Sequence, residues 1–230
     1  MSMKIDNIDI TQYNGKQCSI NIQPSTFNTE SLWESNFITP VVFNKNATLK
    51  KITLEFAVKG TDKDTINNNV SNIIKLMSKQ ATYKFDGYEH YYCCIADTPT
   101  VKTSCKKFKI LNTTLYGFEY AEAKQYQFSD TITINNAATA ISPAILKITS
   151  NIGLNSLTIT GLTQKPITVQ NIAINTPITI DGEKCVVEEN GKNIFGRTNL
   201  WEFPTIKPGQ NTIKLSSACS CTLTYKPRYL

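Results

Sequence analysis

The clearest alternation of hydrophobic and polar residues lies in Lys51–Gly87, where a strand, a helix and a second strand are predicted in turn. Residues 51–59 alternate between apolar and polar side chains, which is typical of a strand with one buried face. Asp62 can accept hydrogen bonds from the free N–H groups that open a helix. Apolar residues then recur at helical spacing on one face, at Ile66, Val70, Ile73, Ile74 and Met77. The pattern predicts one α-helix, over about Asp62–Lys79, packed against a sheet.

Three dipeptides predict hairpins between the strands that flank them, namely Asn14-Gly15, Asp86-Gly87 and Asn112-Thr113. The strand expected after the third turn, Thr114–Phe128, is long and places its aromatic residues on one side. That side is interpreted as facing the core, or else the strand projects from its domain.

The segment Pro24–Pro40 is polar, is bounded by prolines and carries three aromatic residues, Phe27, Trp33 and Phe37. It is too long for a simple turn, and long ordered segments in compact domains tend to be functional. We therefore expect an extended arm or an ordered loop. Trp33 either covers the adjacent core or anchors a partner, and both alternatives stay open.

The character of the chain changes near Ser129, where aromatic residues become sparse and isoleucine, threonine and asparagine take over. Many short strands separated by frequent turns, without a helix, indicate a β-sandwich or a β-barrel. We therefore expect a mainly β protein with two domains, residues 1–129 and 130–230. No flexible linker separates them, so the two domains are expected to pack closely.

The composition narrows the function classes. The 230 residues carry a net charge of +6, mostly from scattered lysines, and Arg197 and Arg228 are the only arginines. Nucleic-acid-binding proteins usually concentrate basic residues on one face, so sequence-specific nucleic-acid binding is not expected. No apolar run is long enough to cross a membrane, and no secretory signal is apparent. The seven cysteines lack the spacing of a zinc site, so no metal or other cofactor is expected.

The residues that most enzymes need are also missing. His90 is the only histidine, and there is neither a Gly-x-Ser-x-Gly motif nor a phosphate-binding glycine loop. Glu188 and Glu189 are neighbours in a predicted strand and would point to opposite faces. We expect no enzyme, although carboxylates distant in sequence could still form a hydrolase pair. Trp201 is either a plug of the core or a platform on which a sugar could stack.

In the order of its motifs, the chain resembles the distal tail proteins of tailed bacteriophages, the Dit family of siphophage-type tail components. The first half carries the resemblance in its strand, Gly-Thr-Asp break, amphipathic helix and tyrosine-rich Asp-Gly hairpin (TLEFAVKGTDKDTINNNVSNIIKLMSKQATYKFDGYEHYYCC). The second half carries it in PAILKITS, LTITG, ITIDG and WEFPTIKPGQNTIKL, and in the closing Tyr-Lys-Pro-Arg.

The resemblance implies a ring-forming, β-barrel-like belt domain related to tail-tube proteins, followed by a galectin-like or carbohydrate-module-like β-sandwich. Six copies would form a ring that joins the tail tube to the tail-spike hub or baseplate and that could carry receptor-binding proteins. The protein would be made in the bacterial cytoplasm and would reside in the virion.

A ring needs contacts between subunits, and we expect these on the arm and on the long strand. The candidate subunit or partner contacts are Phe27, Trp33, Phe37, Tyr116, Tyr120 and Tyr126. One alternative function is a carbohydrate-binding module that uses Trp201 or Trp33. Another is a tail-tube or tail-terminator protein, against which the additional sandwich counts.

Overall fold

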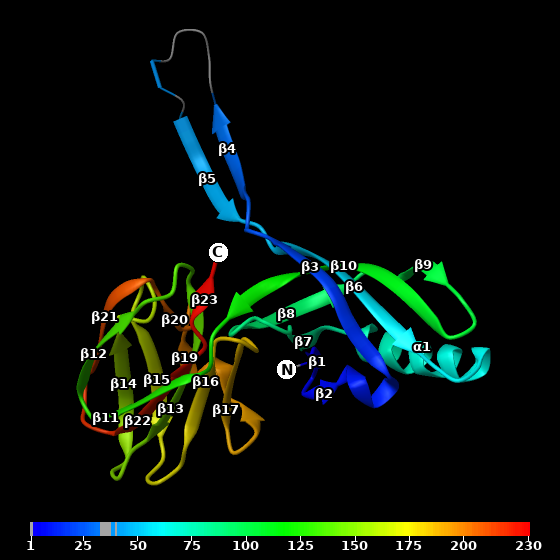
Figure 1. Ribbon diagram of the computed structural model, residues 1–230. Coiled ribbons are helices and arrows are strands. Elements are labelled where there is room, and N and C mark those ends of the chain that lie inside the picture. Colours follow the sequence, from blue (N-terminus) through cyan, green and yellow to red (C-terminus); the bar gives the residue numbers. More distant parts are fainter. Residues whose placement is uncertain (1, 33–37, 40) are drawn as a thin grey trace. The chain divides into compact units, whose positions relative to one another are not determined.

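The computed structural model describes residues 2–32, 38–39 and 41–230 and is mainly β (Figure 1). The chain divides into two compact units, Met1–Tyr120 with Leu230, and Ala121–Tyr229. The division falls before Lys124–Phe128 (β11), not after Ser129 as expected. The physical reason is that β11 pairs along its whole length with Ser220–Tyr225 (β22) of the second unit.

The first unit contains one large sheet. Its strands follow the spatial order β2-β1-β7-β8-β10-β6-β3. The strand β9 also pairs with the first part of β10. The bounds are β1 (Lys4–Ile5), β2 (Ile8–Asp9), β3 (Gly15–Gln23), β6 (Lys50–Lys59), β7 (Ala81–Lys84), β8 (Tyr91–Ala96), β9 (Thr100–Ser104) and β10 (Phe108–Tyr120), with a short 3-10 helix at Ile10–Tyr13.

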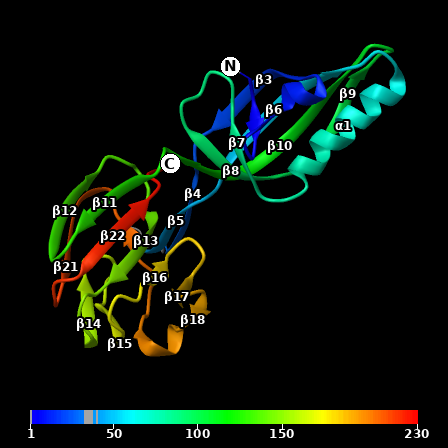
Figure 2. The ribbon, with the colours of Figure 1, turned by 90° about the horizontal axis from the view of Figure 1, so that it is seen from below.

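The predicted helix is confirmed as α1 (Lys63–Met77). The Asp62 carboxylate accepts a hydrogen bond of 2.8 Å from the backbone N–H of Thr65, as the capping pattern predicts. Figure 2 shows α1 running along the sheet of the first unit. Its buried residues Ile66, Val70, Ile73 and Met77 pack into one core with the inward side chains of the sheet.

Only one of the three predicted hairpin turns lies between paired neighbouring strands. Asp86-Gly87 falls in the connection between β7 and β8, which pair antiparallel. Asn14 instead caps the short 3-10 helix in a left-handed conformation, and β3 pairs with β6. The Asn112-Thr113 prediction is wrong, because β10 runs through these residues and is held by β6 across the whole interval.

The aromatic side of β10 faces the core only at its end, where Tyr120 is buried, which agrees only in part with one of the two interpretations. Earlier in the strand the other side is buried, at Leu111, Thr113 and Leu115, whereas Tyr116 on the aromatic side is 38% exposed. The predicted long strand is also two strands, because the chain leaves β10 after Tyr120 and starts β11 at Lys124.

The arm expected at Pro24–Pro40 is present as an antiparallel pair, β4 (Phe27–Leu32) and β5 (Val41–Ala47). The two strands lie side by side in Figure 1 and form a sheet of their own. Every side chain of β4 is exposed. Trp33 and Phe37 lie outside the described residues.

The second unit is a β-sandwich, as expected, with two sheets that face each other in Figure 1. One sheet has the order β11-β22-β13-β16-β17-β18, with β20 also paired to β13, and the other has the order β12-β21-β14-β15-β19. The bounds not yet given are β12 (Thr131–Asn136), β13 (Ser142–Thr149), β14 (Leu154–Thr160), β15 (Ile167–Ile172), β16 (Ile178–Asp181), β17 (Val186–Glu189), β18 (Lys192–Asn193), β19 (Thr198–Asn199), β20 (Thr205–Ile206), β21 (Gly209–Leu215) and β23 (Arg228–Tyr229), with a 3-10 helix at Phe195–Arg197.

The sandwich core follows directly from the period of two in its strands. Leu146 and Leu223 from the first sheet meet Leu157, Val169 and Ile213 from the second, and all five are fully buried. The inward-facing residues of the two sheets therefore fill the core between them, and no helix is needed to cover it.

Candidate functional site

The structure does not bring the predicted contact residues into one site. Phe27 lies on the arm and is 50% exposed, and Tyr116 on β10 is also exposed. Tyr120 is buried, its ring stacks on Tyr91 and its hydroxyl lies 3.2 Å from Thr82 Oγ1. Phe27 and Tyr116 can therefore meet a partner directly, whereas Tyr120 mainly supports the first unit.

Tyr126 belongs to the second unit, on β11. It is partly buried, and its ring stacks on Tyr225 with a centroid distance of 6.3 Å. This packing gives Tyr126 a structural role within the sandwich, so a contact through Tyr126 would use only its remaining exposed edge.

The arm exposes apolar residues that the sequence reasoning did not single out. Leu32, Val42 and Phe43 expose 42%, 53% and 69% of their surface. The register of the pair shifts after Glu30, which leaves Phe43 as the extra residue of a bulge. Exposed apolar residues grouped on a two-stranded arm are a feature of interaction surfaces.

A second cluster joins three charged or titratable side chains inside the first unit. The Glu119 carboxylate receives Lys50 Nζ at 2.5 Å on one oxygen and lies 2.5 Å from His90 Nδ1 on the other. Burial alone would raise the pKa of Glu119, but the hydrogen bonds from Lys50 and His90 outweigh it and lower the pKa. Lys50 is only 5% exposed, so the cluster is a buried ion pair at the ends of β6 and β10.

Trp201 is 72% exposed, so the interpretation as a plug of the core is wrong. The Lys165 ammonium lies 4.5 Å from the centroid of its ring, within range of a cation–π contact. The adjacent Glu202 carboxylate accepts a hydrogen bond from the backbone N–H of Gln164. Trp201 is thus presented to solvent on a short, braced loop, and its role as a sugar platform stays a prediction.

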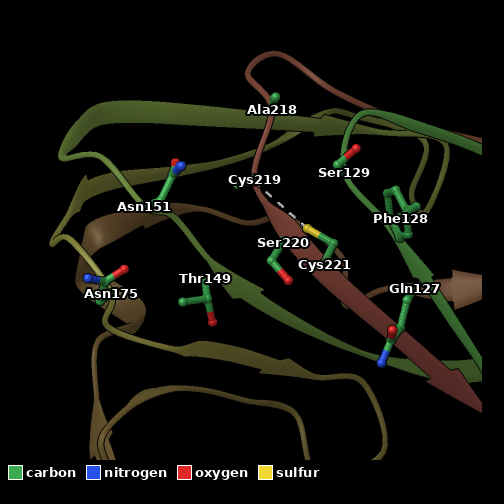
Figure 3. Close-up of a pocket in the computed structure, with 10 residues that line it drawn as sticks. All are labelled: Gln127, Phe128, Ser129, Thr149, Asn151, Asn175, Ala218, Cys219, Ser220 and Cys221. Carbon is green, nitrogen blue, oxygen red and sulfur yellow. Dashed lines mark hydrogen bonds between the residues drawn. The ribbon is translucent and has the colours of Figure 1, made fainter.

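A pocket of about 620 Å³ lies at one end of the sandwich (Figure 3). Four chain segments form it, and the sequence shows no signal that would join them. They contribute Gln127, Phe128 and Ser129, then Thr149 and Asn151, then Asn175, and finally Ala218, Cys219, Ser220 and Cys221. The lining is therefore uncharged, and most of its polar groups are amides and hydroxyls.

Two cysteines of this pocket are buried and close together. The sulfur atoms of Cys219 and Cys221 are 3.9 Å apart, and burial raises the pKa of both thiols. A raised pKa keeps a thiol protonated and unreactive at neutral pH. Among the residues that the structure describes, no group of three or more histidine, cysteine or acidic side chains could hold a metal ion.

Comparison with known proteins gives the following result. Residues 137–229 match the family model described as "siphovirus-type tail component, C-terminal domain". This confirms the resemblance to distal tail proteins. Comparison with curated protein sequences gives no match.

Solved structures extend the likeness, as a likeness of fold, to the rest of the chain. The crystal structure of the Dit protein of phage SPP1, described as a paradigm of the hub adsorption apparatus in phages that infect Gram-positive bacteria, matches with a TM-score of 0.79 and 12% identity. The match covers 100% of this chain and 99% of that one. Two structures of the phage P2 baseplate in its activated conformation, one with calcium and one with strontium, each match with a TM-score of 0.58 and 10% identity over 95% of this chain and 92% of theirs.

No helix in residues 2–32, 38–39 and 41–230 is long and apolar enough to cross a bilayer.

Proposed function

We propose that this protein is a structural hub of a phage tail tip or baseplate, and that copies of it form a ring. The ring joins the tail tube to the tail-spike hub and to the apparatus that recognises the host. Its six copies are inferred by analogy with the family that the chain resembles. Its partners are then further copies of itself, the tail-tube protein, a tail-associated hub protein and a receptor-binding protein. The protein resides in the virion after synthesis in the bacterial cytoplasm, and it has no catalytic role.

The observation that carries this proposal is the end-to-end likeness of fold to the SPP1 Dit protein, which is described as a paradigm of the hub adsorption apparatus. An alignment over nearly the full length of both chains includes both units, so it does not rest on a common sandwich alone. The separate family match over residues 137–229 supports the same assignment. In this proposal the first unit is the ring-forming belt domain and the second unit is the galectin-like domain.

The first unit offers two different surfaces that a closed ring can use. A ring needs a head-to-tail interface, in which one patch of a subunit meets a different patch of the next. The arm provides exposed apolar residues, with Phe27, Leu32 and Phe43 among them. On the sheet, β3 is the terminal strand of the order and pairs with β6 only, within the described chain. A free strand edge can accept a segment of a neighbouring subunit.

The test is the oligomeric state of the purified protein, measured by native mass spectrometry and sedimentation velocity, with negative-stain images of the same sample. We expect a single closed ring of six copies. The arm double variant Phe27→Ser/Phe43→Ser should lose most of the ring, because both residues are exposed and contribute little to folding of the monomer. The matched control, Ile141→Ser, removes a residue that is 55% exposed in the second unit and should leave the ring intact.

Two outcomes would contradict the proposal, and a third would exclude the arm as the contact. A wild-type protein that stays monomeric at high concentration, without rings in the images, would refute ring formation. Long stacks of rings would instead favour the tail-tube alternative, since a tube protein polymerises along the tail axis whereas a hub stops at one ring. Equal losses in the arm variant and the control would show that the arm is not the contact.

A further inference from the structure

The pocket at the end of the sandwich concentrates polar side chains that the protein itself does not use. Its six neutral polar residues make no side-chain hydrogen bond with any part of the chain that the structure describes. They are Gln127, Ser129, Thr149, Asn151, Asn175 and Ser220. By contrast, the side-chain amide of Asn211, elsewhere in the second unit, donates to the backbone carbonyls of Lys207 and Gly209.

Figure 3 shows how these groups are placed around the pocket. Asn151 and Asn175 come from two loops and lie on the same side of the pocket in Figure 3. Thr149 and Ser220 are cross-strand partners on β13 and β22, so their hydroxyls share one face of the sheet. Gln127 on β11 adds a third amide from the edge of the same sheet. Amides and hydroxyls each donate and accept hydrogen bonds, so this set can pair with both kinds of partner.

The uncharged lining limits the chemical class of a ligand. No lysine, arginine or carboxylate lines the pocket, so nothing in it would compensate the burial of a phosphate, a carboxylate or a cation. The partly buried ring of Phe128 adds an apolar surface at the wall. A ligand that combines many hydroxyl groups with apolar C–H faces fits such a lining, and a volume of about 620 Å³ is in the usual range for small-ligand sites.

We propose that this pocket binds a neutral saccharide unit, through hydrogen bonds from the amides of Gln127, Asn151 and Asn175 and the hydroxyls of Thr149 and Ser220. A peptide strand is disfavoured, because strand addition uses a row of backbone groups along one edge, whereas here side chains converge from four segments. The site is distinct from Trp201, which does not line the pocket. The inference concerns the second unit alone and does not depend on whether the protein forms a ring.

The test uses the full-length protein on an array of immobilised neutral, sialylated and sulfated oligosaccharides, with positive signals quantified by calorimetry. Asn175 has a φ of +56°, which glycine tolerates and alanine does not, so the pocket variant is Asn151→Ala/Asn175→Gly. We expect wild-type protein to bind neutral glycans in preference to anionic ones. We also expect the variant to raise Kd by roughly tenfold or more, since it removes two amides that can bond the ligand.

Two controls make the result specific to the pocket. Gln210→Ala removes an exposed amide on β21, outside the pocket, and Trp201→Ala removes the platform that the sequence suggested. Both should bind like wild type, and all variants should melt at the wild-type temperature. The proposal is overturned if no neutral glycan binds, if the pocket variant binds as tightly as wild type, or if only Trp201→Ala abolishes binding. Selection of peptides instead of glycans by the same pocket would overturn it as well.

Discussion

The buried ion pair between Lys50 and Glu119 provides the sharpest test of how the first unit is stabilised. The two side chains expose only 6% and 14% of their surface and are 2.5 Å apart, and His90 occupies the second oxygen of the carboxylate. The substitution Glu119→Gln keeps the shape of the side chain but removes its charge. Lys50 would then be buried without a counter-ion.

The expected cost of this change is about 3–5 kcal/mol of the free energy of unfolding, because one partner of a buried pair is left as an uncompensated charge. For a unit of this size that loss lowers the melting temperature by roughly 10 °C or more. Differential scanning calorimetry of the full chain measures it, and we expect the transition of the first unit to move while that of the second stays in place.

The effect also has a defined pH dependence. The folded-state pKa of Glu119 lies below 4.5, its ordinary value, because hydrogen bonds from Lys50 and His90 outweigh the effect of burial. A carboxylate with a lowered pKa contributes stability above its unfolded pKa and loses it as the pH falls. The difference between wild type and Glu119→Gln should therefore shrink as the pH falls below about 4.5.

A matched control separates burial from simple charge pairing. Lys102 Nζ and Glu55 are 2.6 Å apart, but Lys102 is 55% exposed, so Lys102→Met should cost only about 0–1 kcal/mol. The double variant Lys50→Met/Glu119→Leu should recover much of the loss, because no charge stays buried. A cost for Glu119→Gln no larger than that of the control would refute the reasoning.

Two further predictions concern local structure, and thermal unfolding tests both. Gly117→Ala would push a Cβ into the backbone of β8 and the sulfur of Cys94, so we expect it to lower the free energy of unfolding by about 1–3 kcal/mol or more. The Cβ of Gly153→Ala meets nothing within 4 Å, so this control should leave the free energy of unfolding unchanged. Equal melting temperatures of the two variants would contradict this expectation. The hydrogen bond from the Thr65 N–H to Asp62 is the main reason that the pKa of Asp62 is lowered to about 2. Asp62→Ala should lower the melting temperature at pH 7, and its difference from wild type should shrink as the pH falls from about 3.8 towards 2. Asp62→Asn should keep the cap, but its stability should no longer depend on pH through this residue.

The elements that depend on neighbours in sequence could be predicted, and those that depend on distant partners could not. The helix was predictable because its cap, Asp62, and its apolar face are all local. By contrast, Asn112-Thr113 is compatible with a turn as well as with a strand, and β6 decides between them by pairing with β10 on both sides of it. The turn at Asp6 and Asn7 was missed because it lacks glycine, although both residues adopt a positive φ there.

The candidate sites show the same limit. Exposure of the arm could be anticipated, because its polar, proline-bounded sequence holds too few apolar residues to form a core. The pocket could not be anticipated, because Gln127, Asn151, Asn175 and Ser220 come together only through the strand order of the sandwich. Single asparagines and serines on turns are common in any β protein, and nothing in their spacing marks these four.

The strand order of the second unit has a consequence for synthesis of the protein on the ribosome. In the sheet, β22 lies between β11 and β13, yet it is translated about 70 residues or more after both of them. Until Ser220–Tyr225 has left the exit tunnel, β11 has no partner and β13 lacks one of its neighbours. The nascent sandwich therefore presents two unpaired strand edges while most of it is already outside the tunnel, which is a condition that favours aggregation. Ribosomes that pause between β13 and β22 would prolong this exposure, so yield during expression should depend on how quickly the codons between these two strands are read.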